Sequence, residues 1–502
     1  MEFKNFINGV WKPSSNKKFS ENRNPANWNE DLIGMFPLST IEDVDEAVAA
    51  AKEAFKKWEL IPAPKRGDVL KEVGDIMLKR KDEIAFEMTR EMGKVFAETK
   101  GDTQEGIDTA YYAASEGRRL FGKNAPSELP NKMNLSFRVP IGVAGIITPW
   151  NFPMAIPTWK IFPALVCGNT VVFKPAEITP KTANILVQII DEAMKTVLGK
   201  DYIPGVINLV HGKGSIVGEA FLSNKDIELI SFTGSTLVGK RINEIGGKDL
   251  KRISLELGGK NAQIVMDDAN LDLALDAVLW GAFGTTGQRC TATSRLILHK
   301  SIHDKFVNML IAKAKKLKLG YGNDKGVDVG PCVSEAQRNT VDEYVKIGLN
   351  EDNAKLMLGG EFAAEGDLKK GWFYKPTIFT GVKPGMRIEQ EEIFGPVLSV
   401  IKCESLEDAI EILNDTEYGL SSSIFTNKVN DAFTAVRDIK AGITYINGAT
   451  IGAEAHMPFG GVKATGNGHR EGGWTVYEFY SEWKAVYIDY SGKLQRAQID
   501  NY

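Results

Sequence analysis

The spacing of apolar side chains predicts helices in the first third of the chain. After Thr40, apolar residues recur every three or four positions as far as Trp58, which predicts a helix capped by Thr40. A second amphipathic stretch covers Arg66 to Arg90. Between Leu135 and Trp150 the pattern changes to short apolar runs, which predict strands.

Strands and helices then alternate in short units. The pattern predicts buried strands at 170–173, 206–210 and 229–232, each followed by a helix, and the alternation continues from Gln263 to about Ile446. This order predicts an α/β fold with two domains built on parallel, helix-covered sheets. The tail, 483–490, alternates like a strand and predicts either a plain exterior strand or an edge that pairs with another subunit.

Composition narrows the class of protein. With 502 residues, 43% hydrophobic and 25% charged, the chain has the make-up of a globular protein of two or three domains. A net charge of −4 gives no electrostatic reason to bind nucleic acid. The first residues lack the pattern of a secretory signal, and the most apolar stretch, 153–165, is interrupted by prolines and a lysine. We therefore expect neither nucleic acid nor a membrane as a partner.

Cysteine usage predicts the compartment. The four cysteines lie far apart, at 167, 290, 332 and 403, with no paired spacing. This argues against a disulfide framework and against a zinc site, so we expect no metal and a reducing cytoplasm. The roles of Cys332 and Cys403 stay open.

Cys290 differs from the other cysteines in its surroundings. It follows a run of small residues, 281–286, that leaves little bulk to bury a thiol. Cysteine is more often buried, so an accessible one calls for a chemical reason. The neighbouring Arg289 would favour the thiolate, which is the nucleophilic form.

Several polar groups follow predicted strands, where open α/β sheets bind ligands. Lys174 and Glu177 can face a ribose, or they can be ordinary loop residues. Gly234 and Ser235 open a helix and can bind a pyrophosphate, although Ser235 can equally be a simple helix cap. The Gly-x-Gly-x-x-Gly fingerprint is absent, so no standard dinucleotide loop is supported.

Two further residues are candidates for catalysis. Glu256 lies between leucines and is either a surface residue or a general base with a raised pKa. Asn151 lies in a turn bracketed by prolines and aromatics, where its amide can stabilise an oxyanion or merely cap backbone groups.

Taken together and in this order, seven segments resemble the aldehyde dehydrogenase family. They are Thr148-Pro149-Trp150-Asn151-Phe152-Pro153, Phe173-Lys174-Pro175-Ala176-Glu177, Phe232-Thr233-Gly234-Ser235-Thr236, Leu255-Glu256-Leu257-Gly258-Gly259-Lys260, Gly287-Gln288-Arg289-Cys290, Glu392-Ile393-Phe394-Gly395-Pro396 and Pro458-Phe459-Gly460-Gly461. The family oxidises aldehydes to acids with NAD(P). The resemblance implies that Cys290 attacks the aldehyde, that Asn151 and the Cys290 N–H hold the oxyanion, and that Glu256 activates the water that hydrolyses the thioester.

The same resemblance implies a set of cofactor-binding residues. Lys174 and Glu177 would hold the adenosine ribose, Ser235 the pyrophosphate, and Glu392 the nicotinamide ribose. The set also includes Trp150, Gly234, Gly258 and Phe394. Because a carboxylate at the ribose repels the extra phosphate of NADP, Glu177 favours NAD, with NADP still possible.

The resemblance also implies a domain plan. It assigns 1–128 and 147–260 to a nucleotide-binding domain, 261–446 to a catalytic domain, 129–146 and 480–502 to an oligomerisation arm, and 447–479 to a substrate mouth and glycine-rich loop. An arm of this kind implies a homodimer or a homotetramer, and the choice between them stays open.

The substrate is harder to predict. Arg289 can pair with a distal carboxylate, or it can point into an interface, and Trp159 and Phe459 are further candidates for substrate contact. The stretches 447–458 and 464–470 look like those of bacterial 2-oxoglutarate semialdehyde dehydrogenases, whereas 290–295 is similar to betaine aldehyde dehydrogenases. We favour a carboxylate-bearing semialdehyde. Alternatives are betaine aldehyde, a broad range of aldehydes, transfer of the thioester to coenzyme A, which Glu256 argues against, or a catalytically silent binding protein.

Overall fold

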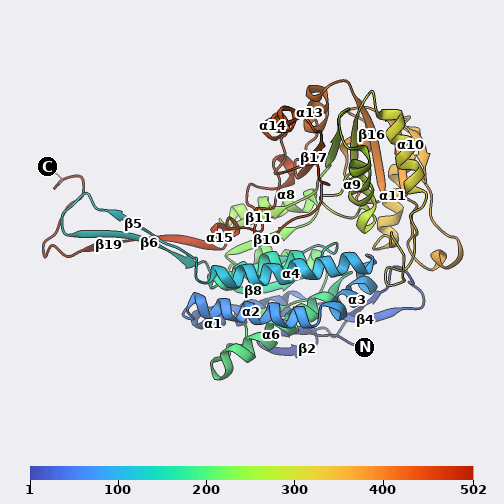
Figure 1. Cartoon of the computed structure of the whole chain (residues 1–502). Coiled ribbons are helices and arrows are strands. Elements are labelled where there is room, and N and C mark those ends of the chain that lie inside the picture. Colours follow the sequence, from blue (N-terminus) through green and yellow to red (C-terminus); the bar gives the residue numbers. More distant parts are fainter. Residues whose placement is uncertain (501–502) are drawn as a thin grey trace.

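Short strands that are apolar on both faces form two seven-stranded sheets. The computed structural model describes residues 1–500 (Figure 1). Figure 1 shows one sheet with its helices in the lower part of the molecule, the other in the upper part, and a thin β-arm projecting from the lower part. The α/β class predicted from the sequence is confirmed.

The first sheet brings together strands from the N-terminus and the middle of the chain. In spatial order it contains β11 (Arg252–Glu256), β10 (Leu229–Thr233), β7 (Val143–Ile147), β8 (Thr170–Lys174), β9 (Ile207–Leu209), β1 (Asn5–Ile7) and β2 (Val10–Lys12). The strands from β11 to β9 are parallel, and β1 and β2 extend the sheet with antiparallel pairs. Val171 and Phe173 pack into one apolar cluster and Val172 into another, so helices cover both faces.

Eight helices pack around this sheet. They are α1 (Ile41–Trp58), α2 (Ala63–Lys79), α3 (Lys81–Met92), α4 (Phe96–Glu116), α5 (Ala155–Cys167), α6 (Pro180–Leu198), α7 (Glu219–Ser223) and α8 (Thr236–Lys248). The helix predicted after Thr40 is confirmed as α1, with a capping box between Thr40 and Asp43. The amphipathic stretch from Arg66 to Arg90 is divided between α2 and α3, because the backbone at Arg80 leaves the helical conformation.

The second sheet contains, in spatial order, β14 (Lys355–Leu358), β15 (Thr377–Val382), β16 (Val397–Cys403), β13 (Arg295–His299), β12 (Ala262–Val265), β17 (Ser421–Phe425) and β18 (Ile443–Ile446). All neighbours are parallel except β14 and β15. Its helices are α9 (Leu271–Phe283), α10 (His303–Ala314), α11 (Glu335–Asn350), α12 (Arg387–Gln390), α13 (Leu406–Asn414) and α14 (Val429–Asp438).

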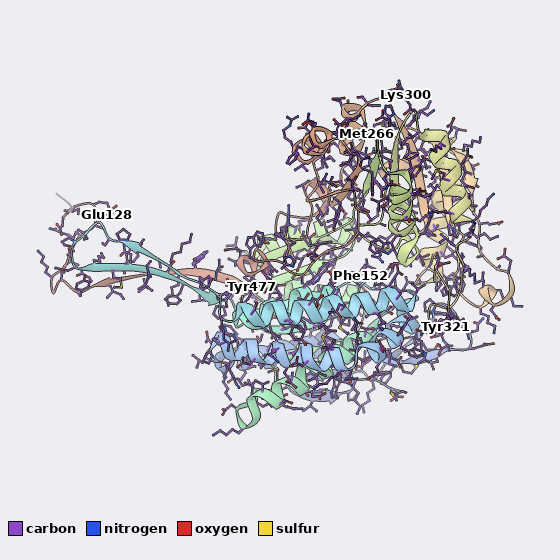
Figure 2. All side chains as sticks on the ribbon, in the orientation of Figure 1. Glu128, Phe152, Met266, Lys300, Tyr321 and Tyr477 are labelled. Atoms are coloured by element: carbon purple, nitrogen blue, oxygen red, sulfur yellow. The ribbon has the colours of Figure 1, made fainter. Side chains whose placement is uncertain are left out.

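The arm is a three-stranded sheet of β19 (Ser481–Asp489), β6 (Lys132–Pro140) and β5 (Lys123–Pro126). The predicted tail strand lies largely within β19, which pairs along its whole length with β6 and leaves its other edge unpaired within the described chain. Figure 2 shows Glu128 near the far end of the arm and Tyr477, in the short helix α15 (Val476–Phe479), near its base. Positions 501 and 502 of the predicted arm lie outside the described residues.

Smaller elements complete the chain. Two strands, β3 (Phe19–Arg23) and β4 (Leu32–Pro37), form a separate antiparallel pair. Of the helices within residues 1–500, none has the length and apolar character needed to cross a bilayer.

Asn169 joins the arm to the first sheet, and its removal tests how strongly they are connected. Its Oδ1 accepts hydrogen bonds from the N–H groups of Ile141 (2.8 Å) and Gly142 (3.0 Å), and its Nδ2 donates to Tyr480 O (2.7 Å). In Asn169→Ala these buried groups lose their partners, so we expect a loss of about 2–4 kcal/mol in stability, which lowers Tm by roughly 5 °C. Thermal scanning measures this, with Asn350→Ala at the exposed end of α11 as the control. Equal Tm values for the two variants would contradict the role of Asn169.

Candidate active site

Five adjacent parallel strands end at the same edge of the first sheet. The register pairs Ile147 with Lys174 and Thr233 with Glu256, so the carboxyl ends of β7, β8, β10 and β11 are level. The turn that holds Asn151 follows β7, Lys174 ends β8 and Glu177 lies in the turn after it, Ser235 follows β10, and Glu256 ends β11. Segments more than 100 residues apart in the sequence therefore meet at one edge.

Beside this edge lies a cavity of about 840 Å³ that reaches Cys290. Glu256, Arg289, Trp159 and Phe459 line the same cavity. The rings of Trp159 and Phe459 lie 4.8 Å apart and pack in one apolar cluster with Cys290. Figure 2 shows Phe152, another lining residue, at the junction between α4 and the upper part of the molecule. The structure thus brings together the predicted nucleophile, base and substrate residues.

The loop before Cys290 has an unusual backbone. Thr285, Thr286 and Gly287 all have positive φ, at 52°, 59° and 67°, which costs energy for the two threonines. The loop is held by a hydrogen bond from Thr286 Oγ1 to Gly330 O (2.9 Å) and one from Asn261 Nδ2 to Cys290 O (2.7 Å). These contacts fix the position of the Cys290 thiol without using the thiol itself.

Cys290 is a neutral thiol at rest. Burial, together with the negative charges of Glu392 and Glu256, raises its pKa to about 12. The guanidinium of Arg289 is paired instead with Glu98, 2.8 Å away. The expectation that Arg289 favours the thiolate is therefore wrong, because the desolvation of the thiol and the nearby carboxylates outweigh the neighbouring positive charge.

Glu256 is buried, with only 4% of the residue exposed, so a surface role is ruled out. Neither of its carboxylate oxygens forms a hydrogen bond to any other described residue. Burial, and secondly the charge of Glu471, raises the pKa of Glu256 well above its usual value, whereas Lys160 and Arg470 act in the opposite direction. A carboxyl group of this kind has the properties of a general base.

The glycine-rich loop at 458–468 makes room for Glu256. A Cβ atom at Gly460 would lie 2.4 Å from Glu256 Oε1, so a larger residue at this position would displace the carboxylate. The loop is bound to the end of β11 through Leu257 N to Thr465 O (2.7 Å) and Leu255 N to Asn467 Oδ1 (3.0 Å). The loop therefore closes the site over the end of the strand.

A buried ion pair, which sequence reasoning missed, lies near Glu256. Lys160 Nζ donates to Glu471 Oε1 (2.6 Å) and to Ser231 Oγ (2.9 Å), and both charged side chains are almost fully buried. Because both charges influence the pKa of Glu256, this pair contributes to the electrostatics of the site.

Asn151 is buried beside the cavity rather than in its wall. Its side chain is 2% exposed, and its Oδ1 has no hydrogen-bond partner among the described residues. Phe152, the next residue, lines the cavity. On the other side, the ring of Trp150 meets that of Phe394 edge-on, with centroids 5.3 Å apart.

Glu392 lies against the backbone of the Gly258-Gly259 turn. Its Oε1 accepts a hydrogen bond from Gly259 N (3.0 Å), and a Cβ at Gly258 would lie 2.4 Å from its Oε2. Burial raises the pKa of Glu392 to about 7, although the Gly259 N–H and Lys260 favour the charged form. Glu392 thus lies against the Gly258-Gly259 turn and close enough to Cys290 for its charge to raise the pKa of the thiol, and Phe394 follows it in the chain.

The remaining predicted cofactor residues do not line the cavity and lie further along the sheet edge. The Lys174 ammonium is buried and donates to Pro175 O (2.8 Å), and burial lowers its pKa to about 8. Glu177 is exposed, and its Oε1 accepts from Gly214 N (3.0 Å). Ser235 and Gly234 precede α8, where Ser235 is exposed and makes no side-chain cap, so the free N–H groups there suit an anion.

Acidic residues of α4 form a wall of the cavity that sequence reasoning missed. Glu98, Asp102 and Glu105 all line it, and Glu105 Oε1 has no hydrogen-bond partner among residues 1–500. Their spacing of four and three residues places them on one face of a helix, and this was the available signal. In the described part of the chain, no group of three or more His, Cys, Asp or Glu is arranged to hold a metal ion.

Comparisons with known proteins agree with this geometry. The model of the aldehyde dehydrogenase family matches residues 11–486. The chain is 42% identical to the alpha-ketoglutaric semialdehyde dehydrogenase of Bacillus subtilis, over 96% of this chain and 97% of that protein. It is 38% identical to the betaine aldehyde dehydrogenase of the same species, over 96% of both chains.

A solved structure extends the likeness to three dimensions. The betaine aldehyde dehydrogenase of Staphylococcus aureus in complex with NAD⁺ superposes with a TM-score of 0.93 at 35% identity, over 98% of this chain and 96% of that chain. The resemblance inferred from the seven sequence segments is thereby confirmed. The chain belongs to the aldehyde dehydrogenase family, whose members are NAD(P)-dependent oxidoreductases that act on aldehydes.

Proposed function

We propose that this aldehyde dehydrogenase uses Cys290 as its nucleophile and Glu256 as its base, and that its substrate is a carboxylate-bearing semialdehyde such as 2-oxoglutarate semialdehyde. The observation that supports the chemistry is that a thiol and a buried carboxylate without a hydrogen-bond partner line the same apolar cavity. The observation that supports this choice of substrate is that the positively charged Arg289 lines the cavity, where it can bind a carboxylate.

The first step joins Cys290 Sγ to the aldehyde carbon and gives a thiohemiacetal. Because the pKa of the thiol is about 12, its proton must leave as the C–S bond forms; it passes to solvent water in the open cavity, so that Glu256 stays ionised for the later hydrolysis. The negative charge moves to the carbonyl oxygen. The N–H groups of Cys290 and Thr291 already lower the thiol pKa, and with the Asn151 amide they supply donors for this oxyanion.

The second step converts the thiohemiacetal into a thioester and then into the acid. NAD(P), when bound, accepts the hydride that the aldehyde carbon loses. Glu256 then removes a proton from water, the hydroxide adds to the thioester carbon, and the C–S bond breaks. Hydrolysis is favoured over transfer to coenzyme A, because a buried carboxylate that can activate water lines the same cavity as Cys290.

The chain's residues fit the adenosine half of NAD. Glu177, at the end of β8, can accept hydrogen bonds from the ribose hydroxyls, and Lys174 lies at the end of the same strand. The uncapped start of α8, at Gly234 and Ser235, suits the pyrophosphate. The Glu177 carboxylate repels a 2′-phosphate, so we propose that NAD is preferred to NADP. Glu392, with Gly258, Trp150 and Phe394, would hold the nicotinamide half.

The arm supports a proposal about assembly. The unpaired edge of β19 and the exposed rings of Trp483 and Tyr487 offer both hydrogen-bonding groups and apolar area to another subunit. We propose a homodimer or homotetramer built through this arm, within the domain plan given above. Four unpaired cysteines suit a reducing compartment such as the cytoplasm.

A carboxylate-bearing substrate is supported by Arg289, whose guanidinium lies over the rings of Phe152 and Trp280 at 5.4 Å and 5.9 Å. The alpha-ketoglutaric semialdehyde dehydrogenase of Bacillus subtilis, named for such a substrate, is 42% identical to this chain. Betaine aldehyde is the second candidate. The aromatic rings of Trp159, Phe459 and Tyr111 in the cavity wall favour it, because such rings bind quaternary ammonium groups.

In Glu256→Gln, the first turnover should survive while thioester hydrolysis slows by about 10²–10⁴-fold. Stopped-flow measurement should show an NADH burst followed by a slow steady state. In the wild type, the steady-state rate should rise with pH through the raised pKa of Glu256, because the base is its ionised form, and this rise should be lost in the variant. Cys290→Ala is the control and should give no burst. A normal steady state in Glu256→Gln would exclude its role as base.

Glu177→Gln should raise kcat/KM with NADP relative to NAD by about tenfold, because one charge that repels the 2′-phosphate is removed. Initial rates with both cofactors measure the ratio. Glu244→Gln, at an exposed position of α8, is the control for a general change in charge. If the ratio of kcat/KM with NADP to that with NAD is unchanged in Glu177→Gln, the 2′-position of the adenosine ribose does not lie beside Glu177.

Arg289→Met tests the substrate class. We expect kcat/KM for 2-oxoglutarate semialdehyde to fall by about 10–100-fold, the value of a charge-assisted hydrogen bond. The value for pentanal, an uncharged aldehyde of the same chain length, should change far less, and betaine aldehyde should improve. Equal changes for all three aldehydes would rule out recognition of a carboxylate by Arg289.

A further inference from the structure

Arg289 already has a carboxylate partner inside the protein. Its Nη2 donates to Glu98 Oε1 (2.8 Å), and its Nε donates to Thr285 Oγ1 (2.9 Å). Both charged side chains are 11% exposed, and both line the cavity that holds Cys290. No hydrogen bond to Arg289 Nη1 occurs among residues 1–500, so this nitrogen keeps two donors for another acceptor.

Glu98 also holds the loop that carries the nucleophile. Its two oxygens accept from the backbone N–H of Thr285 at 2.9 and 3.0 Å. Thr285 begins the run of positive φ that leads to Cys290. One carboxylate from α4 therefore contacts both the strained backbone and the guanidinium.

Several acidic side chains line this cavity, and among the described residues Glu98 is the one that forms an ion pair with Arg289. Lys94 lies 3.4 Å from the centre of the Phe152 ring, but its charge is balanced by Asp102, 2.8 Å away, and both side chains are fully buried. Arg289 is thus the partly accessible cation of this wall, and Glu98 shares it.

We propose that Glu98 is a specificity-determining residue whose carboxylate competes with the substrate carboxylate for Arg289. The inference rests on the proposed function, because it requires Arg289 to bind the substrate. Two carboxylates share one planar guanidinium: Glu98 occupies Nη2, and the substrate takes Nη1. The negative charge of Glu98 reduces the attraction for the substrate. Glu98 therefore sets how strongly the site prefers acidic aldehydes, while its second role is to position the loop before Cys290.

Glu98→Gln separates these two roles. The amide keeps an oxygen for the Thr285 N–H but loses the negative charge. We expect the ratio of kcat/KM for 2-oxoglutarate semialdehyde to that for pentanal to rise by about five- to tenfold, since one unit charge a few ångströms away is removed. A ratio that stays the same or falls would overturn the inference.

Two comparisons make the test specific. Asp108→Asn removes a charge from the same wall, but Asp108 contacts Gln104 and not Arg289, so its effect measures the general electrostatic contribution. The rise in Glu98→Gln must exceed it, and an equal rise would overturn the inference. In an Arg289→Met background, Glu98→Gln should change the ratio no more than Asp108→Asn does. If Arg289→Met itself leaves the wild-type ratio unchanged, the proposed function fails; if only Glu98→Gln is silent, the inference alone fails.

A binding measurement covers the case in which Glu98→Gln loses activity. Calorimetry measures the Kd of 2-oxoglutarate for two proteins, the Cys290→Ala variant and the same variant with Glu98→Gln added. We expect about five- to tenfold tighter binding with Gln. Unchanged or weaker binding would overturn the inference even if the loop had moved.

Discussion

The common edge at which β7, β8, β9, β10 and β11 end is the constraint on which the site depends. Parallel pairing keeps the strands level, so each carboxyl end delivers a short segment to the same place. The turn that holds Asn151, the exposed Glu177, the start of α8 and the buried Glu256 all come to one edge through this arrangement. The loop with the unusual backbone at 285–287 then leads to Cys290, which lines the same cavity as Glu256.

The surroundings of Glu256 are built by parts of the chain that lie far apart in the sequence. Glu256 ends a strand of the first sheet, but its burial depends on Gly460, where the lack of a side chain leaves space for the carboxylate. Glu471, Lys160 and Arg470 then determine the electric field at Glu256. The site therefore combines apolar surroundings with a small number of balanced charges, and this combination keeps a carboxyl group basic.

The sequence predicted the fold class and most elements, because these depend on local patterns, and it singled out Cys290 and Glu256, which line one cavity in the structure. Apolar runs and their spacing are enough to predict β8 or α1, and the motif around Cys290 consists of adjacent residues that can be read from one sequence. The charge state of Cys290 was not predictable, because it depends on Glu392 and Glu256, which are remote in the sequence. The pairing of Arg289 was missed for the same reason, since Glu98 precedes it by 191 positions. The break at Arg80 was missed because the amphipathic pattern continues through it.

The high pKa of the Cys290 thiol has a consequence for the lifetime of the protein. Peroxides and alkylating agents react with thiolates, and at neutral pH very little of this thiol is ionised. The Cys290 thiol is therefore expected to react more slowly with such reagents than an exposed cysteine, because the same desolvation and carboxylates keep it protonated until a substrate enters. The chemical stability of this thiol and its delayed reactivity have the same physical cause, which is its burial next to two carboxyl groups.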